Sequence, residues 1–432
     1  MYGRHEFNVT HRAPMRFVAG DGSYLIDDQG NRYLDCWNDE GVASLGYRSV
    51  EMEGALAGFC VTGIPHRLPR AFVGAVREDH SKYICEVMGY PDGRVFYANS
   101  GAEANETAIK LARLWQTRHG THNDNDRKPK MGVVTLRGNF HGRTALALAA
   151  SDSTDSPYHK DGFGPMPAMF GTVDYVLDDG APHGIRLQLL NPTVPGGGSQ
   201  LPPGDDVNLR MDQVGAINLA PVLGNNVVHT YPKELFTRLR AWADANGVLI
   251  IYDDVQAGAG RTGYFSSWQH PNIGVRPDIL CLGKGLAMGW PMSAVLARDD
   301  IARAITPGTH FNSMAGGEFI CFMSTVLLDW VEEHRGEVAF KGEGIKARLG
   351  AFPWIKEVSG YGLMLAFEPD WSQVPYTGKE LCEASWAQGL LIMTWRDHGP
   401  IRFNPPMNVT VQELEGAFRA LEAAHQSLLV RS

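Results

Sequence analysis

Six short runs of consecutive apolar residues recur between residues 94 and 300, and stretches of helical character separate them. The runs do not alternate between apolar and polar residues, which is typical of parallel strands buried on both faces of a sheet. The predicted strands are Arg94–Ala98, Met131–Leu136, Val214–Ala220, Val248–Tyr252, Asp278–Leu282 and Ser293–Ala297. The pattern therefore predicts an α/β fold with a large, mostly parallel sheet.

Other segments follow different patterns. Residues 20–50 predict a hairpin, because glycine and aspartate separate short apolar pieces there. Pro232–Asn246 predicts a helix that begins with proline and ends just before Gly247. After about residue 311, a long helix over Glu318–Glu333 leads into a mixture of strands and helices. This last part predicts a second, smaller domain.

The composition describes a large and mildly acidic chain of 432 residues, with 44% hydrophobic residues and a formal net charge of −9. Scattered basic residues argue against nucleic acid as the main partner. No run approaches 18 apolar residues, and the first 20 residues lack the apolar core of a signal peptide, so we expect no membrane segment and a cytoplasmic location. The six cysteines form no C-x-x-C pair, which favours a reducing compartment, and we expect no metal site.

The first candidate motif is Ser100–Glu106, which follows a predicted strand and opens a helix. Ser100 and Glu103 have the spacing of a capping box. Gly101 lets backbone amides approach an anion closely, and the helix dipole favours negative charge there. The segment therefore predicts a phosphate site or, on its own evidence, only a well-capped helix.

The second candidate motif is a pair of carboxylates, Asp253 and Asp254, at the end of the apolar run VLIIY. Ligands bind at the C-terminal ends of strands in open α/β sheets. Asp253 lies nearer the buried run and has a desolvation cost unless it is paired, and a protonated pyridine nitrogen is such a partner. The alternative is an aspartate that caps the next turn.

The third candidate motif is Lys284, which lies between Gly283 and Gly285 at the end of another apolar strand. The two glycines leave room for a bulky group on the amine. A desolvated lysine loses its proton readily and becomes a nucleophile for aldehydes. The alternative is a lysine that extends from a turn into solvent.

Four segments, taken in order, resemble the class III aminotransferases, the ornithine, acetylornithine and GABA type of fold type I enzymes. These segments are SGAEANETAIKLAR, GNFHGRT, DDVQAGAGRTG and PDILCLGKGL. The resemblance extends from about Gly20 to about Pro406. It implies an enzyme dependent on pyridoxal 5′-phosphate (PLP) that moves an amino group from an amine or (di)amino acid donor to a 2-oxo acid, with 2-oxoglutarate as the expected acceptor.

The resemblance also implies an organisation of the chain. Residues 56–310 would form the large PLP-binding domain with the mostly parallel sheet. Residues 1–55 and 311–432 would together form a small α+β domain. Two copies would associate as a homodimer with shared active sites.

The resemblance assigns cofactor-binding roles residue by residue. Lys284 would hold the cofactor as a Schiff base, and Asp253 would bind the pyridinium nitrogen, so these two residues carry the catalysis. The amides of Gly101 and Ala102 would bind the phosphate, and Phe140 and Val255 would pack on the two faces of the ring. Gln256 would contact the ring hydroxyl. Ser313, where the family has threonine, would bind the phosphate of the other subunit across the dimer.

Two arginines match the family's substrate site. Arg143 and Arg402 would each bind a substrate carboxylate, because the guanidinium binds carboxylates bidentately. Where ornithine-type and GABA-type members carry a glutamate that screens the second arginine, this chain has Asn225. We therefore expect Arg402 to stand unscreened.

Glu40 lies in an N-terminal loop that lines the substrate pocket in ornithine-type relatives. It is either a solvated carboxylate beside Asp39 or a group that needs a cationic partner in a partly dry pocket. With Lys284 and Arg402 assigned elsewhere, that partner would be a second amino group on a diamino substrate.

Two other functions remain open from the sequence. An aminomutase or a decarboxylating transaminase of the same fold would share these motifs. Gly258–Gly263 also fits the G-x-G-x-x-G pattern of an NAD-dependent dehydrogenase, but no helix is predicted to follow it. In such enzymes, the acid that binds the ribose follows the second strand. The nearest acid here, Asp278, instead precedes a strand.

Overall fold

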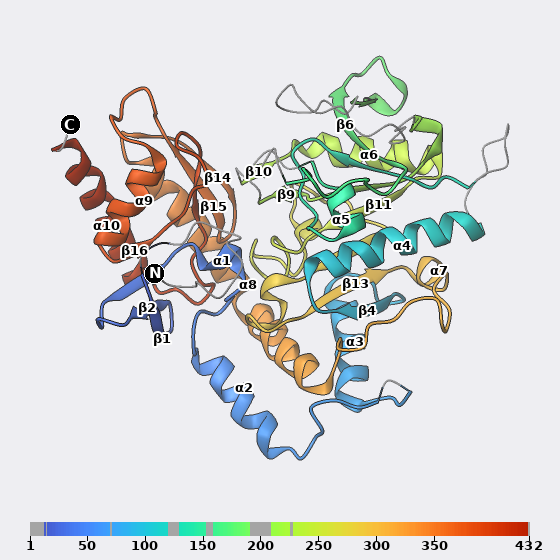
Figure 1. The fold of residues 1–432 in the computed structure, drawn as a ribbon, viewed down its shortest axis with the longest axis horizontal. Coiled ribbons are helices and arrows are strands. Elements are labelled where there is room, and N and C mark those ends of the chain that lie inside the picture. Colours follow the sequence, from blue (N-terminus) through green and yellow to red (C-terminus); the bar gives the residue numbers. More distant parts are fainter. Residues whose placement is uncertain are drawn as a thin grey trace.

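The computed structural model describes residues 13, 15–69, 71–119, 129–152, 159–190, 209–224 and 228–430. Figure 1 shows one large sheet with its helices and, beside it, a smaller group in which the first strands lie next to the last helices. Asn225, the departure from the family noted above, lies outside the described residues. No described helix is long and apolar enough to cross a membrane.

The large sheet has eight strands in the order β4-β13-β12-β11-β8-β5-β6-β7. Parallel pairing joins β12 to β11, β11 to β8, β8 to β5, and β5 to β6, whereas β13 and β7 run antiparallel to their neighbours. The strands are β4 (Arg94–Ala98), β5 (Gly132–Leu136), β6 (Phe170–Leu177), β7 (Ile185–Leu189), β8 (Val214–Leu219), β11 (Leu249–Asp253), β12 (Ile279–Leu282) and β13 (Ser293–Ala297). The predicted α/β fold with a mostly parallel sheet is confirmed.

Both faces of this sheet are buried, as the continuous apolar runs predict. Along β11, Ile250 and Tyr252 belong to one apolar cluster, whereas Leu249 and Ile251 belong to the cluster on the opposite face. All five residues of this strand are buried. Apolar side chains therefore predominate along the central strands, with the buried Asn218 in β8 and Thr135 in β5 as polar exceptions.

The sequence pattern missed strands β6 and β7. They lie at one edge of the sheet, and their outward positions are partly or fully exposed. Polar residues such as Asp174, Arg186 and Gln188 occupy those positions and interrupt the apolar runs. The continuous-run criterion finds central strands and overlooks edge strands of this kind.

The helices of this part contact the strands or one another, and the helix Val50–Val61 lies away from the sheet and packs on the long helix (Figure 1). They are α2 (Val50–Val61), α3 (Ala75–Val87), α4 (Gly101–His119), α5 (Ala145–Ala149), α6 (Lys233–Asn246), α7 (Asp299–Ala302) and α8 (Glu318–Gly350), with single 3-10 turns η1 (Pro182–Gly184), η2 (Met211–Gln213), η3 (Ser267–Gln269) and η4 (Lys284–Ala287). Helix α6 agrees with the prediction except that Pro232 is its N-cap; Gly247 ends it in a left-handed conformation.

Helix α8 is much longer than predicted, because it continues past Glu333 to Gly350. Three glycines, Gly336, Gly342 and Gly344, lie inside the added part of the helix. A Cβ atom at Gly342 would collide with the carbonyl oxygen of Gly362, so glycine here allows close packing of the helix against a neighbouring turn. Tertiary packing outweighs the low helix propensity of glycine.

Both ends of the chain build the smaller group. Strands β1 (Phe17–Asp21), β2 (Tyr24–Asp27) and β3 (Arg32–Asp35) form a sheet that β16 (Leu390–Leu391) completes, and Leu34 pairs with Leu390. Its other elements are α1 (Asn38–Gly41), β14 (Ile355–Tyr361), β15 (Met364–Pro369), β17 (Ile401–Phe403), α9 (Gly378–Ala387) and α10 (Val411–Leu429). The short strands β9 (Val222–Leu223) and β10 (His229–Thr230) follow β8 in the middle of the chain and pair with each other. The pairing of residues 34 and 390 joins an N-terminal and a C-terminal segment in one sheet.

The segment Gly258–Gly263 does not form a dinucleotide site. It continues as turns into the single 3-10 turn η3 and not into an α-helix, whose N-terminus would bind the pyrophosphate. Asp278 is buried and its carboxylate contacts Arg240 at 2.7 Å, Arg298 at 2.9 Å and the Ile250 amide at 2.7 Å. The Asp278 carboxylate therefore stabilises the sheet, and it is not free to bind a ribose.

Removal of the Asp278 carboxylate should destabilise the fold strongly. Asp278→Ala leaves buried donors without their acceptor, and loss of one partner of a buried ion pair costs about 3–5 kcal/mol. The free energy of unfolding in denaturant measures this. The control is Asp174→Ala, which removes an exposed pair with Arg137 and should cost about 0–1 kcal/mol. Equal losses in both variants would contradict a structural role for Asp278.

Candidate active site

The start of helix α4 lies where strands β4, β11 and β12 end. The Ser100 hydroxyl accepts a hydrogen bond from the Glu103 amide at 3.3 Å, which caps the helix as predicted. A Cβ atom on Gly101 would lie 2.6 Å from Cγ1 of Val255, and one on Gly283 would lie 3.4 Å from the Gly101 Cα. Three segments therefore meet at one helix N-terminus, where free amides and the helix dipole attract anions.

Asp253 ends β11, and its carboxylate is buried at this edge. Its Oδ2 accepts hydrogen bonds from Asn105 Nδ2 at 2.9 Å and from His141 Nδ1 at 2.8 Å, and its Oδ1 accepts one from the Val255 amide at 3.2 Å. These donors offset the desolvation cost of the carboxylate. Asp253 is therefore surrounded by donors from three segments of the chain.

Sequence reasoning missed His141 and Asn105 as members of the site. His141 Nε2 lies 3.0 Å from the Thr135 hydroxyl, and the Asn105 carbonyl accepts a hydrogen bond from Asn218 at 2.9 Å, so both partners of Asp253 are themselves fixed. Both residues stand inside motifs that the sequence analysis quoted. Their pairing with Asp253 is a tertiary contact that motif spacing does not reveal.

Lys284 follows the end of β12 on the neighbouring parallel strand. Its Nζ lies 2.8 Å from Glu40 Oε2 and 3.2 Å from Gln256 Oε1, and its backbone has a positive φ of 45°. The alternative of a lysine extending into solvent does not hold, because its side chain is only 24% exposed and both contacts lie inside the site.

An N-terminal turn packs against the lysine turn. The Ser44 hydroxyl donates to the Gly285 carbonyl at 2.9 Å. A Cβ atom on Gly285 would lie 2.9 Å from the carbonyl oxygen of Gly41, so the second glycine of the motif allows this close approach. The turn that carries Glu40 is therefore held directly over Lys284.

Glu40 lies between two cations. One carboxylate oxygen contacts Lys284, and the other pairs with Arg402, whose side chain on β17 is buried. Burial alone would raise the pKa of Glu40, but Lys284 and Arg402 together lower the pKa to about 2. The carboxylate is therefore ionised throughout the physiological range.

Two expectations about these residues are wrong. Arg402 does not stand unscreened, because Glu40 pairs with it. Glu40 is not a solvated loop carboxylate either, and it does not lack a cation within the protein. The negative charge that is missing from position 225 in the sequence is supplied to Arg402 from position 40.

The segment between β5 and α5 brings further predicted residues to the helix start. A Cβ atom on Gly142 would lie 2.7 Å from the Cβ of Ala102, so residues 140–143 pack on the first turn of α4. The guanidinium carbon of Arg143 lies 5.5 Å from the ring centroid of Phe140. Arg143 is exposed, and within the described chain no direct contact joins it to Arg402 or Lys284.

Comparison with known proteins decides the family. The family model of class III aminotransferases matches residues 7–425. The chain is a class III aminotransferase. An acetylornithine aminotransferase of Aquifex aeolicus is 31% identical to it over 96% of this chain and 98% of that protein, and one of Caldanaerobacter subterraneus is 32% identical over 97% and 96%.

Solved structures agree with this family. The ornithine aminotransferase of Toxoplasma gondii superimposes with a TM-score of 0.81 at 25% identity, covering 99% of this chain and 94% of that one. The acetylornithine aminotransferase of Elizabethkingia anophelis gives 0.76 at 25% identity, covering 98% and 96%. This aminotransferase therefore has the predicted fold type I architecture, depends on PLP, and moves amino groups between an amine donor and a 2-oxo acid.

The residues present in the aminotransferase fit PLP. The amide nitrogen Nε2 of Gln256 is buried without a hydrogen-bond partner, which leaves a donor for an oxygen of a bound ring. Asp253 offers a carboxylate, the start of α4 offers amides for a phosphate, and Lys284 offers an amine. These groups converge at one edge of the sheet, as the cofactor requires.

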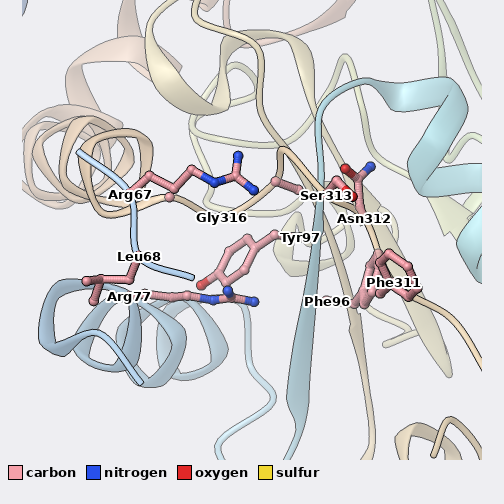
Figure 2. Close-up of a pocket in the computed structure, with 11 residues that line it drawn as sticks. Arg67, Leu68, Arg77, Phe96, Tyr97, Phe311, Asn312, Ser313 and Gly316 are labelled. Atoms are coloured by element: carbon pink, nitrogen blue, oxygen red, sulfur yellow. The ribbon is translucent and has the colours of Figure 1, made fainter. Parts of the chain in front are cut away.

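Ser313 stands apart from these groups. It lies on the exposed loop before α8 and lines a cavity of about 230 Å³ together with Arg67, Arg77 and Tyr97 (Figure 2). Within the described part of the chain, Ser313 has no contact with Lys284, Asp253 or Gly101. One chain alone therefore does not bring this hydroxyl into its own cofactor site.

Because Glu40 is paired with two cations, the aminotransferase should lose stability as the pH becomes acidic. An ordinary glutamate titrates near 4.5, whereas the folded protein keeps Glu40 ionised to about pH 2. The stabilising contribution is therefore complete above pH 4.5 and disappears as the pH falls to 2. On cofactor-free full chain, where Lys284 has a free amine, the stability difference between wild type and Glu40→Gln should shrink across this window. Asp39→Asn is the control, and a pH-independent difference would contradict the pairing.

Proposed function

We propose that this aminotransferase takes an amino group from an amino acid or diamino donor and delivers it to 2-oxoglutarate. The observation that carries the proposal is the convergence of Lys284, Asp253 and the start of α4 at the ends of neighbouring strands. Arg402, buried next to the lysine, supplies the carboxylate recognition that both an amino acid and a 2-oxo acid need.

Lys284 would hold the cofactor covalently through Nζ and would later act as the base. PLP, when bound, supplies an aldehyde that condenses with amines and a ring that withdraws electrons from the carbon bearing the nitrogen. Once the donor amine has displaced it from the cofactor, Nζ of Lys284 would take a proton from the substrate carbon. It would then deliver this proton to the cofactor carbon. The contact of Nζ with Gln256 at 3.2 Å supports a position of the amine beside the ring.

Asp253 would accept a hydrogen bond from the protonated ring nitrogen. Its partners His141 and Asn105 fix the carboxylate so that it is already oriented when the cofactor arrives. Val255 and Phe140 would pack on the two faces of the ring, and Gln256 would donate to the ring oxygen. The amides of Gly101 and Ala102 would bind the phosphate at the helix start.

A second copy of the chain would complete this phosphate site. The Ser313 loop carries two exposed apolar side chains, Phe311 and Met314, which are exposed by 57% and 70%. Arg67 and Arg77 line the same cavity as Ser313, and neither has a described carboxylate within ion-pair distance. An apolar rim around an anion-binding hollow supports a homodimer in which Ser313 reaches the phosphate held by the partner.

A cytoplasmic location is part of the proposal. All six cysteines are free thiols, and five of them are buried. Free buried cysteines are stable in a reducing compartment.

Lys284→Ala should abolish turnover and the covalent cofactor bond. After borohydride reduction, mass spectrometry should find the cofactor on the Lys284 peptide of the wild type and on no peptide of the variant. Lys346→Ala is the matched control, because its side chain is likewise 24% exposed and it carries no proposed role. Normal transamination by Lys284→Ala would overturn the assignment.

Ser313→Ala should weaken retention of the cofactor, because loss of a hydrogen bond to a charged phosphate costs about 1.5–3 kcal/mol. Ser313→Thr should retain the wild-type affinity. Titration of cofactor-free enzyme with PLP, followed by the visible absorption band, measures both. Equal affinity of wild type and Ser313→Ala would show that the hydroxyl does not reach the phosphate.

A further inference from the structure

The loop before helix α8 alternates between partly buried and exposed side chains where it carries Ser313. This Ser313 loop spans residues 306–317. His310 and Asn312 are partly buried and contact helix α4, whereas Phe311 and Ser313 are exposed. Two inward side chains therefore fasten the loop to the helix, and Ser313 lies on the outer side of the loop.

Asn312 fixes the turn at Ser313. Its Oδ1 accepts a hydrogen bond from the Met314 amide at 3.0 Å, which closes a turn around Ser313, and another from Asn99 Nδ2 at 3.2 Å. Its Nδ2 donates to the Glu103 carboxylate at 2.9 Å, on the first turn of α4. The turn is therefore tied to the helix through a side chain that does not titrate.

His310 makes a second tie to α4, and its two contacts fit one protonation state. Nε2 lies 2.9 Å from the Thr107 hydroxyl, and Nδ1 lies 2.8 Å from Nζ of Lys110. The Thr107 hydroxyl donates its proton to the Glu103 carbonyl at 2.9 Å, so it accepts from Nε2. An ammonium group can only donate, so Nδ1 accepts from Lys110. The hydrogen bonds therefore require neutral His310 with its proton on Nε2.

Protonation of His310 would disrupt this tie. An imidazolium carries a proton on Nδ1, which would point at the Lys110 ammonium and replace a hydrogen bond by repulsion between like charges. Burial, together with the charge of Lys110, lowers the pKa of His310 below its ordinary value of 6.5. The tied loop thus binds fewer protons than a released loop, so the tie weakens as the pH falls below 6.5.

The other charged groups on the elements around His310 already have partners. The His310 ring stacks on Phe96 of β4, with ring centroids 4.8 Å apart. On the same strand, Arg94 pairs with Asp299 of α7, which also pairs with Arg303. The carboxylate on the first turn of α4 is bonded to the loop itself. Among the described residues, the ammonium on α4 is therefore the charge that acts on His310.

We infer that His310 is a positioning residue for Ser313, which in its neutral form ties the Ser313 loop to Thr107 and Lys110 and on protonation loosens it. The inference rests on the proposed role of Ser313 at the phosphate held by the partner. It makes that role depend on pH, because each subunit loses its hold on the cofactor of the other in mildly acidic solution. Helix α4 would then bind one phosphate with its first turn and position the loop for the second with its next turns.

The test is the rate of cofactor release from the holoenzyme above and below pH 6.5. Free PLP is separated by gel filtration and quantified. Wild type should release PLP about tenfold faster on the acid side, as expected for loss of a hydrogen bond to a charged phosphate. His310→Ala should be fast at every pH. His310→Gln should be slow at every pH, because its amide replaces the Nε2 donor and does not titrate.

Lys110→Gln distinguishes this tie from a purely structural contact. Without the ammonium, protonated His310 meets no like charge, and the glutamine carbonyl can accept from Nδ1. The midpoint of the acid step should therefore move up towards pH 6.5. Asn312→Ala should speed release by the same factor at every pH and leave the midpoint unchanged, because asparagine does not titrate.

His270→Gln is the matched control. His270 also stacks on an aromatic ring, that of Tyr361, and burial together with Lys346 lowers its pKa in the same way. Within the described residues, it has no contact with the Ser313 loop. This variant should keep both the slow release and the acid step of the wild type.

The outcomes separate this inference from the proposed role of Ser313. An acid step that persists in His310→Gln, or an unchanged midpoint in Lys110→Gln, would overturn the inference while Ser313→Ala still releases PLP quickly. If Ser313→Ala instead retains PLP as the wild type does at every pH, the proposed role of Ser313 fails, and His310 has no hydroxyl to position.

Discussion

A buried carboxylate at the end of a central strand is tolerated only where donors surround it, and the site is built around this constraint. Asp253 receives donors from α4 through Asn105 and from the segment after β5 through His141. Asn218 on β8 and Thr135 on β5 fix those donors in turn. One charge thus ties a helix to three neighbouring strands, and the same ties set the position of the helix start relative to the strand ends.

The second organising feature is the charge balance over Lys284. Lys284, the proposed catalytic residue, is carried by the large sheet, whereas Glu40 and Arg402 come from the two ends of the chain. Their pairing joins the N-terminal turn, β17 and the lysine turn at one point. A shift in any of these segments therefore changes the electrostatic potential at Nζ of Lys284. The smaller group of elements thus influences this amine through its charges as well as through its packing.

The sequence predicted those parts of the fold that local patterns determine. The central strands were predicted because burial on both faces leaves unbroken apolar runs. Strands β6 and β7 were not predicted, because one side of each is exposed to solvent. Lys284 and Asp253 were found because each stands at the end of such a run. His141 and Asn105 were missed because their partner lies more than 100 positions away, and only the folded chain brings them to Asp253.

The error over Arg402 has a different cause. Comparison with a family asks which residue occupies a given position, and at position 225 the expected acid is absent. A guanidinium that is 2% exposed is stabilised by a negative charge at the right distance, and any segment that reaches it can supply that charge. Glu40 does so from a turn that a motif comparison treats as unrelated. Glu40 therefore supplies, from another segment of the chain, the negative charge that the comparison with the family sought at position 225.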